Sequence, residues 1–100
     1  MAIFASESVE QVEIRERVKK LQQLFADDPE VARIDYRFDG DWSGDPSVFL
    51  DIVLKRKKLE NATLFRVSRQ VFKGLLDIIR SEELGMHSYL DFVSLSENGK

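Results

Sequence analysis

The sequence contains no cysteine, so it can form neither a disulfide nor a thiolate metal site. It also has no apolar run near the length of about 18 residues that marks a membrane-spanning helix. Its opening residues lack the charged and then apolar pattern of a signal peptide. We therefore expect a cytoplasmic protein that does not enter the membrane.

Patterns typical of catalysis and of nucleic-acid binding are missing as well. There is no G-x-G-x-x-G pattern and no Walker loop, and the one histidine, His87, has no serine or cysteine nucleophile at a recognisable spacing. We place His87 in a loop. The chain has 18 Asp and Glu against 15 Lys and Arg, a formal net charge of -3, whereas a general nucleic-acid binder needs a basic surface. Nucleic acid is therefore not an expected partner.

The hydrophobic pattern predicts two helices. The first runs from a serine cap, Ser6 or Ser8, to about Ala26, and the second from a cap at Asn61 to about Ser81. Their predicted buried faces consist of apolar residues at helical spacing: Val12, Val18, Leu21 and Phe25 in the first helix, and Leu64, Phe65, Val71, Phe72, Leu75, Ile78 and Ile79 in the second.

Three further apolar segments predict strands. Residues 34–39 alternate apolar and charged side chains, residues 48–54 are apolar on both faces and predict the central strand, and residues 89–95 form the last strand. The order α-β-β-α-β predicts an α+β fold, a two-layer sandwich with two helices on one face of a three-stranded sheet. We expect residues 1–100 to form a single domain with a disordered tail at 96–100. The open edges of so small a sheet favour a homodimer.

The segment between the first two strands, residues 39–47 (loop 39–47), carries more turn chemistry than a connection needs. It holds three aspartates, two glycines, a proline and the only tryptophan of the chain. Trp42, with Asp41 and Asp45 beside it, predicts a contact surface for a partner chain, because tryptophan is a strong interface anchor. Two alternatives stay open. The spacing of Asp39, Asp41 and Asp45 matches the start of a calcium loop, without the glutamate of its twelfth position, and the same aspartates suit a simple polar turn.

Two aspartates lie inside apolar strands, where a carboxylate is costly unless it is paired or coordinated. Asp51 belongs to the central strand and Asp91 to the last one. They could converge on a divalent metal, pair with a neighbouring basic side chain, or lie on the wet face of the sheet. The run Lys55-Arg56-Lys57-Lys58 also has two interpretations, a phosphate grip or a solvated loop that protects the adjacent apolar strand from aggregation.

Several of these features together resemble the minimal nucleotidyltransferase family. The helix that contains Phe25, the turn Asp28-Pro29-Glu30-Val31 and the strand that ends Tyr36-Arg37-Phe38-Asp39-Gly40 are similar to the opening of that family, and the resemblance spans nearly the whole chain. The resemblance implies that an active member would hold Mg²⁺ through its strand acids, at Asp51 and Asp91, and phosphate at its glycine turn, at Gly40 and Gly44. Asp39 is a further metal candidate from loop 39–47, and Lys55 and Arg56 are phosphate candidates from the basic run alone.

This sequence departs from the family pattern at two positions that the chemistry needs. Asp41 replaces the serine after the first glycine, and Phe49 stands where the first metal acid belongs. Two carboxylates normally hold Mg²⁺ against the nucleotide phosphates, which the acids of loop 39–47 would repel. The resemblance therefore implies a non-catalytic member without a cofactor. Minimal family members often act as antitoxin-type partners of a small helical (HEPN) ribonuclease. An active Mg²⁺-dependent nucleotidyltransferase is the alternative.

A second comparison rests on the fold alone. The α-β-β-α-β order resembles that of small ferredoxin-like regulatory modules, such as the cytoplasmic domain of cation-efflux transporters, which dimerise through their sheets. Those modules carry histidine ligands that this chain lacks. We therefore expect an interaction or regulatory module with a protein partner or a homodimer, and Mg²⁺ or Ca²⁺ only under the alternatives.

Overall fold

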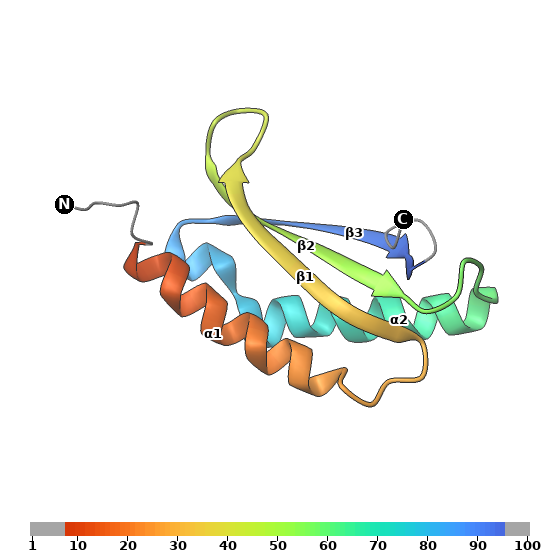
Figure 1. Cartoon of the computed structure of the whole chain (residues 1–100). Coiled ribbons are helices and arrows are strands. Elements are labelled where there is room, and N and C mark those ends of the chain that lie inside the picture. Colours follow the sequence, from red (N-terminus) through yellow and green to blue (C-terminus); the bar gives the residue numbers. More distant parts are fainter. Residues whose placement is uncertain (1–7, 96–100) are drawn as a thin grey trace.

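A computed structural model describes residues 8–95 of the chain, in which two helices cover one face of a three-stranded sheet (Figure 1). The order α-β-β-α-β and the α+β class are confirmed. Two short helical turns follow the second helix. The elements are α1 Val9–Leu24, β1 Val31–Gly40, β2 Pro46–Leu54, α2 Asn61–Gly74, the π-helical turn η1 Leu75–Ile79, the 3-10 turn η2 Ser81–Leu84, and β3 His87–Ser94.

The sheet is mixed and has β2 at its centre. Loop 39–47 connects β1 to β2, and the two strands pair antiparallel. Strand β3 pairs parallel with β2. The prediction that His87 lies in a loop was wrong, because it is the first residue of β3 and pairs with Ser47 of β2. The helical segment from α2 to η2 makes the crossover that a parallel pair requires. The register of these pairs decides which side chains share the open face of the sheet.

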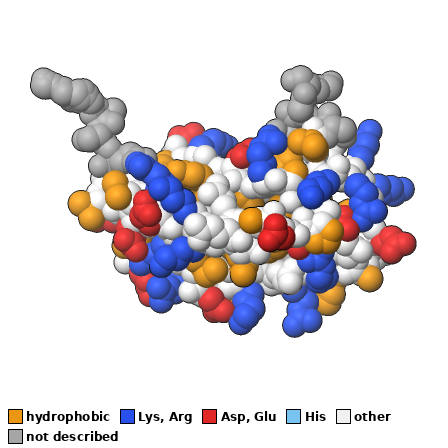
Figure 2. Space-filling view, turned by 60° about the horizontal axis from the view of Figure 1, so that its bottom comes forward, with side chains coloured by type: hydrophobic (Ala, Val, Ile, Leu, Met, Phe, Trp, Pro, Cys, Tyr) orange, Lys and Arg blue, Asp and Glu red, His pale blue; other side chains and the backbone are white. Residues whose placement is uncertain are grey.

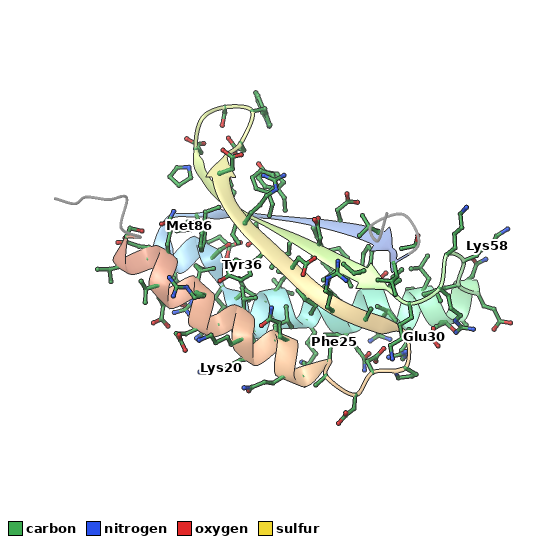
Figure 3. The ribbon with its side chains drawn as sticks, in the orientation of Figure 1. Lys20, Phe25, Glu30, Tyr36, Lys58 and Met86 are labelled. Atoms are coloured by element: carbon green, nitrogen blue, oxygen red, sulfur yellow. The ribbon has the colours of Figure 1, made fainter. Side chains whose placement is uncertain are left out.

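The core lies between β2 and the helices. Val48, Leu50 and Ile52 alternate along β2 and are fully buried on the face toward the helices. Figure 3 shows Phe25, the residue after α1, and Tyr36 of β1 between the helix layer and the sheet. The residues between these β2 positions, such as Asp51, therefore point to the opposite face, which the helices leave uncovered.

Helix α1 begins at a capping box. Ser8 accepts a hydrogen bond from the Gln11 amide, and the Gln11 side chain accepts one from the Ser8 amide. The other predicted cap, Ser6, lies outside the described residues, as does the tail at 96–100. The predicted buried face was wrong at Val12, which is 44% exposed, whereas Ile14 is fully buried and continues the helical spacing of the other core positions.

Helix α2 differs more from its prediction. It ends at Gly74 rather than near residue 81, and its N-cap is Glu60, not Asn61. The broad buried face was wrong too, because the side chains of Phe65 and Phe72 are 64% and 53% exposed. The helix packs on the sheet along a narrow stripe only, as expected for a two-layer fold. Its fully buried apolar residues are Val67 and Val71.

Among residues 8–95, no helix is both long enough and apolar enough to cross a membrane. The helix side of the molecule carries many charged side chains with apolar ones between them (Figure 2).

Candidate functional site

Loop 39–47 projects beyond the end of the sheet as the tip of the β1–β2 hairpin (Figure 1). The strands stay paired up to Gly40 and Pro46, so the turn itself comprises only residues 41–45. Trp42 lies in this turn and is 93% exposed. The tryptophan therefore does not fold back onto the core of its own chain.

The Asp41 carboxylate organises the turn. Its Oδ1 accepts hydrogen bonds from the Ser43 amide (3.0 Å), the Ser43 hydroxyl (2.7 Å) and the Asp45 amide (3.0 Å). The Gly44 amide donates to the Asp41 carbonyl at 2.8 Å, and Gly44 has a φ of 87°, a conformation that strongly favours glycine. One side chain thus satisfies several backbone groups and holds the turn in a single conformation.

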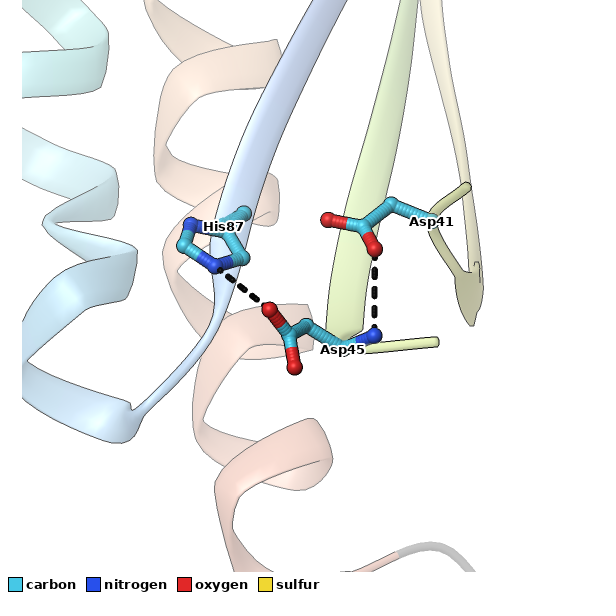
Figure 4. Close-up of side chains that lie close together, drawn as sticks. All are labelled: Asp41, Asp45 and His87. Atoms are coloured by element: carbon cyan, nitrogen blue, oxygen red, sulfur yellow. Dashed lines mark hydrogen bonds and ion pairs between the residues drawn. The ribbon is translucent and has the colours of Figure 1, made fainter. Parts of the chain in front are cut away.

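Strand β3 ties this turn to the sheet. The Tyr89 hydroxyl donates to Asp41 Oδ2 at 2.8 Å, and His87 Nε2 lies 3.4 Å from Asp45 Oδ2 (Figure 4). The Tyr89 ring stacks on Phe49, with 5.1 Å between the ring centroids, and the Arg37 guanidinium lies 4.4 Å from the centroid of the Phe49 ring. Strand β3 therefore contacts the turn directly, and its Tyr89 ring packs on Phe49 of β2.

These contacts shift two pKa values. The hydrogen bond from the Ser43 hydroxyl, and then those from Tyr89 and the amides of Asp45 and Ser43, hold the pKa of Asp41 far below its ordinary value. The same Tyr89–Asp41 bond, with partial desolvation and the nearby acids, raises the pKa of Tyr89. Asp41 is therefore ionised, and Tyr89 neutral, over the whole physiological range.

The proposed calcium ligands are not all brought together. The Asp39 side chain accepts a hydrogen bond from the Gly40 amide and forms an ion pair with Arg37. It does not belong to the cluster that the other two acids form. In its place His87 joins Asp41 and Asp45, with one ligand atom of each within 4.8 Å of the others. Both oxygens of Asp41 already accept hydrogen bonds. The hydrogen bonds from the Ser43 and Asp45 amides to Asp41 are those expected of the polar turn that the sequence left open as an alternative.

A row of three aspartates crosses the open face of the sheet. Asp51 of β2 is the register partner of Asp35 on β1 and of Asp91 on β3. Asp35 forms an ion pair with Arg33 at 3.0 Å. Within residues 8–95, no hydrogen bond or ion pair of the Asp51 or Asp91 side chain is described; their backbones belong to the strand pairs. Asp51 and Asp91, for which convergence on a metal was one of three alternatives, are therefore neighbours on adjacent strands. Sequence reasoning missed Asp35, because only the strand register places it beside them.

Other predicted site residues lie far from this row. Asp39 pairs with Ser47, four residues along β2 from Asp51, which corresponds to about 13 Å. Gly40 and Gly44 lie at the loop before β2, whereas Lys55 and Arg56 follow the end of that nine-residue strand, roughly 26 Å away. Arg56 pairs there with Glu30. No single phosphate could contact both the glycine turn and the basic run.

A scan against protein-family models, a search of curated proteins and a search of solved structures each find no match. The function of the chain is therefore inferred from its own residues.

Proposed function

We propose that this protein is a non-catalytic interaction module that inserts Trp42 of loop 39–47 into a pocket on a partner chain. The observation that carries this proposal is the 93% exposure of Trp42 at the tip of a turn that Asp41 holds in one conformation. A tryptophan with no role in the core of its own chain suits an anchor for another chain.

The energetics of such an anchor are favourable. Burial of a tryptophan removes about 200 Å² of surface from water, which corresponds to a gross gain of about 5 kcal/mol before the cost of association. A flexible loop would lose part of this gain through ordering on binding. Here the hydrogen bonds of Asp41 and Tyr89 order loop 39–47 in advance, so more of the gain remains as affinity.

The side chains around Trp42 do not form a nucleophilic site. The Ser43 hydroxyl lies 2.7 Å from Asp41 and 3.1 Å from Asp45, so carboxylates rather than His87 are its neighbours. The acids of the loop would repel a nucleotide phosphate. In the terms of the nucleotidyltransferase resemblance, these features support a degenerate member with an antitoxin-type role.

Site-specific photocrosslinking in the native host cell tests the proposal. A benzophenone amino acid at position 42 should give discrete adducts with a partner chain. The matched control is the same amino acid at Lys20, which is exposed on α1, on the side of the molecule away from the loop (Figure 3). Equal crosslinking at both positions would show that loop 39–47 is not a binding surface.

The register of the aspartate row favours a second candidate, a Mg²⁺ site at Asp51 and Asp91 of an active nucleotidyltransferase. Two adjacent carboxylates without a described ion pair suit a divalent cation. Calorimetric titration with MgCl₂, with and without nucleoside triphosphates, tests this function, with Asp51→Asn as the control that removes one ligand. Heats that are absent, or that persist unchanged in Asp51→Asn, would dismiss it.

A further inference from the structure

The outer side of α2 carries a groove with an apolar floor, formed by two hollows of 270 and 340 Å³ that share Gln70 and Lys73 in their linings. Leu24 of α1 and the next residue, Phe25, lie at one end of this groove, and Ala62 and Phe65 of α2 lie at the other. We call it the α2 groove. Its size is in the range of sites that bind a large side chain.

An exposed apolar stripe runs along the same helix. Phe65, Phe72 and Leu76 recur at spacings that place them on one side of α2 and its continuation, and their side chains are 64%, 53% and 73% exposed. The sequence predicted Phe65 and Phe72 to be buried, and it made no such prediction for Leu76. A stripe of this kind on a helix indicates a surface that another chain covers.

Basic side chains outnumber acidic ones around the α2 groove. Its lining holds Arg66, Arg69 and Lys73 against Asp28 and Asp77, and ion pairs join Arg66 to Asp28 and Lys73 to Asp77. Residues 55–73, which include the whole first part of α2, contain seven Lys and Arg and a single Glu, a net charge of +6 in a chain of net charge -3. Figure 2, which brings the helix side forward, shows Lys and Arg side chains gathered near the end where α2 begins. Arg69 lines the groove and has no ion pair within residues 8–95, and its guanidinium lies 5.7 Å from the centroid of the Phe65 ring.

This charge selects among occupants. Glu30, Asp28 and Asp77 pair with only three of the seven cations of residues 55–73. Two copies that pair symmetrically through α2 would bring the remaining positive charges together, which is unfavourable. The complementary occupant is an acidic element with a large apolar side chain. Loop 39–47 has this composition, because Asp39, Asp41 and Asp45 surround the exposed Trp42.

We infer that loop 39–47 of one copy docks Trp42 into the α2 groove of a second copy of this chain. The loop projects beyond the end of the sheet, whereas α2 lies on the face of the sheet that the helices cover (Figure 1). Loop 39–47 and the α2 groove are therefore separate surfaces of each molecule. The contact is then head-to-tail and leaves one loop and one groove free at the ends of every assembly, so that it propagates. A single inserted tryptophan buries far less than the roughly 1,200 Å² of a standard stable interface, so the association is weak.

This inference rests on the proposed function of loop 39–47, and complementation between two variants tests it. Sedimentation velocity from about 10 µM to about 1 mM should show wild-type assemblies that grow with concentration. The emission of Trp42, the only tryptophan, should shift to the blue in parallel. Trp42→Ala disables the loop and Arg69→Glu disables the groove, and each alone should remain monomeric. An equimolar mixture should form dimers and grow no further, because only one loop and one groove remain functional.

Lys20→Glu is the matched charge reversal, since Lys20 is exposed on α1 and lines neither hollow of the groove. It should assemble like the wild type, and circular dichroism should show that all variants are folded. The inference would be overturned if Trp42→Ala still assembled. It would also be overturned if Lys20→Glu abolished assembly as fully as Arg69→Glu does.

Two further results would also overturn it. A wild-type protein that stays monomeric at about 1 mM would refute self-docking, whereas a position-42 adduct with a different protein would leave the proposed function standing. Binding of a 20-nucleotide single strand by a monomeric wild type, lost in Arg69→Glu, would assign the groove to nucleic acid instead.

Discussion

The Tyr89 hydroxyl donates a 2.8 Å hydrogen bond to Asp41 Oδ2 and so joins residues 48 positions apart in the sequence. Asp41 lies in the hairpin turn between β1 and β2, and Tyr89 lies on β3. The bond makes the order of the turn depend on the pairing of β3 with β2. The proposed anchor, Trp42, is the neighbour of Asp41, so its presentation depends on the same bond.

Tyr89→Phe should increase the mobility of Trp42 and leave the fold intact. The substitution removes the hydroxyl that holds Asp41 Oδ2, and it keeps the ring that stacks on Phe49. Time-resolved anisotropy of Trp42 should show a larger fast component. Tyr36→Phe is the control, because its hydroxyl has no described partner and its ring packs against the core. Equal anisotropy in wild type and Tyr89→Phe would show that the bond does not order the loop.

Asp41→Asn should destabilise the protein at pH 7 and have a smaller effect at pH 2.5. The folded state lowers the pKa of Asp41 below the value of about 4 in the unfolded chain, so its stabilising effect is fully present above about pH 5. It is lost as the pH falls through the folded pKa. Urea denaturation of both proteins at several pH values measures the difference, and a gap that widens toward low pH would contradict the assignment.

Asp91→Asn should stabilise the protein by roughly 0.2–1 kcal/mol at low salt. Asp91 lies directly opposite Asp51 on the neighbouring strand, and like charges in that position repel each other. The gain should shrink at about 0.5 M salt, where the Debye length is only a few ångströms. Urea denaturation at two ionic strengths checks both statements. A loss of stability would instead indicate that Asp91 has a favourable contact.

Leu50→Ala should lower the free energy of unfolding by about 2–5 kcal/mol, because Leu50 is buried at the centre of the core. Phe72→Ala removes a larger side chain, yet it should change stability by only about 0.5 kcal/mol, since Phe72 is 53% exposed. Chemical denaturation of the two variants compares them directly. Similar losses in both would mean that α2 buries its outer face.

The fold was largely predictable because it depends on local periodicity. The alternation along residues 34–39 and the helical spacing of Val18, Leu21 and Phe25 each specify one element and its buried side. The errors lie where local pattern does not decide burial. Phe65 and Phe72 have the same hydrophobicity as buried residues, but a two-layer fold offers α2 only one surface to pack against.

The candidate site was predictable only in part. The turn chemistry of loop 39–47 is enough by itself to single out Trp42 and Asp41. The roles of Tyr89 and His87 were not visible, because they reach the loop from a strand more than 40 residues later. Their contribution follows from the parallel pairing of β2 with β3, and single-sequence patterns carry no information about pairing partners.

The sequence by itself determined the composition of loop 39–47 and the order of the elements, because turn residues and hydrophobic periods act over short distances. The tertiary structure alone decided that Trp42 stays exposed and that Asp35, Asp51 and Asp91 form one row. It also decided that the glycine turn and the basic run lie at opposite ends of β2. Such relationships depend on strand register and on which face the helices cover, and both are set by the packing of the whole chain.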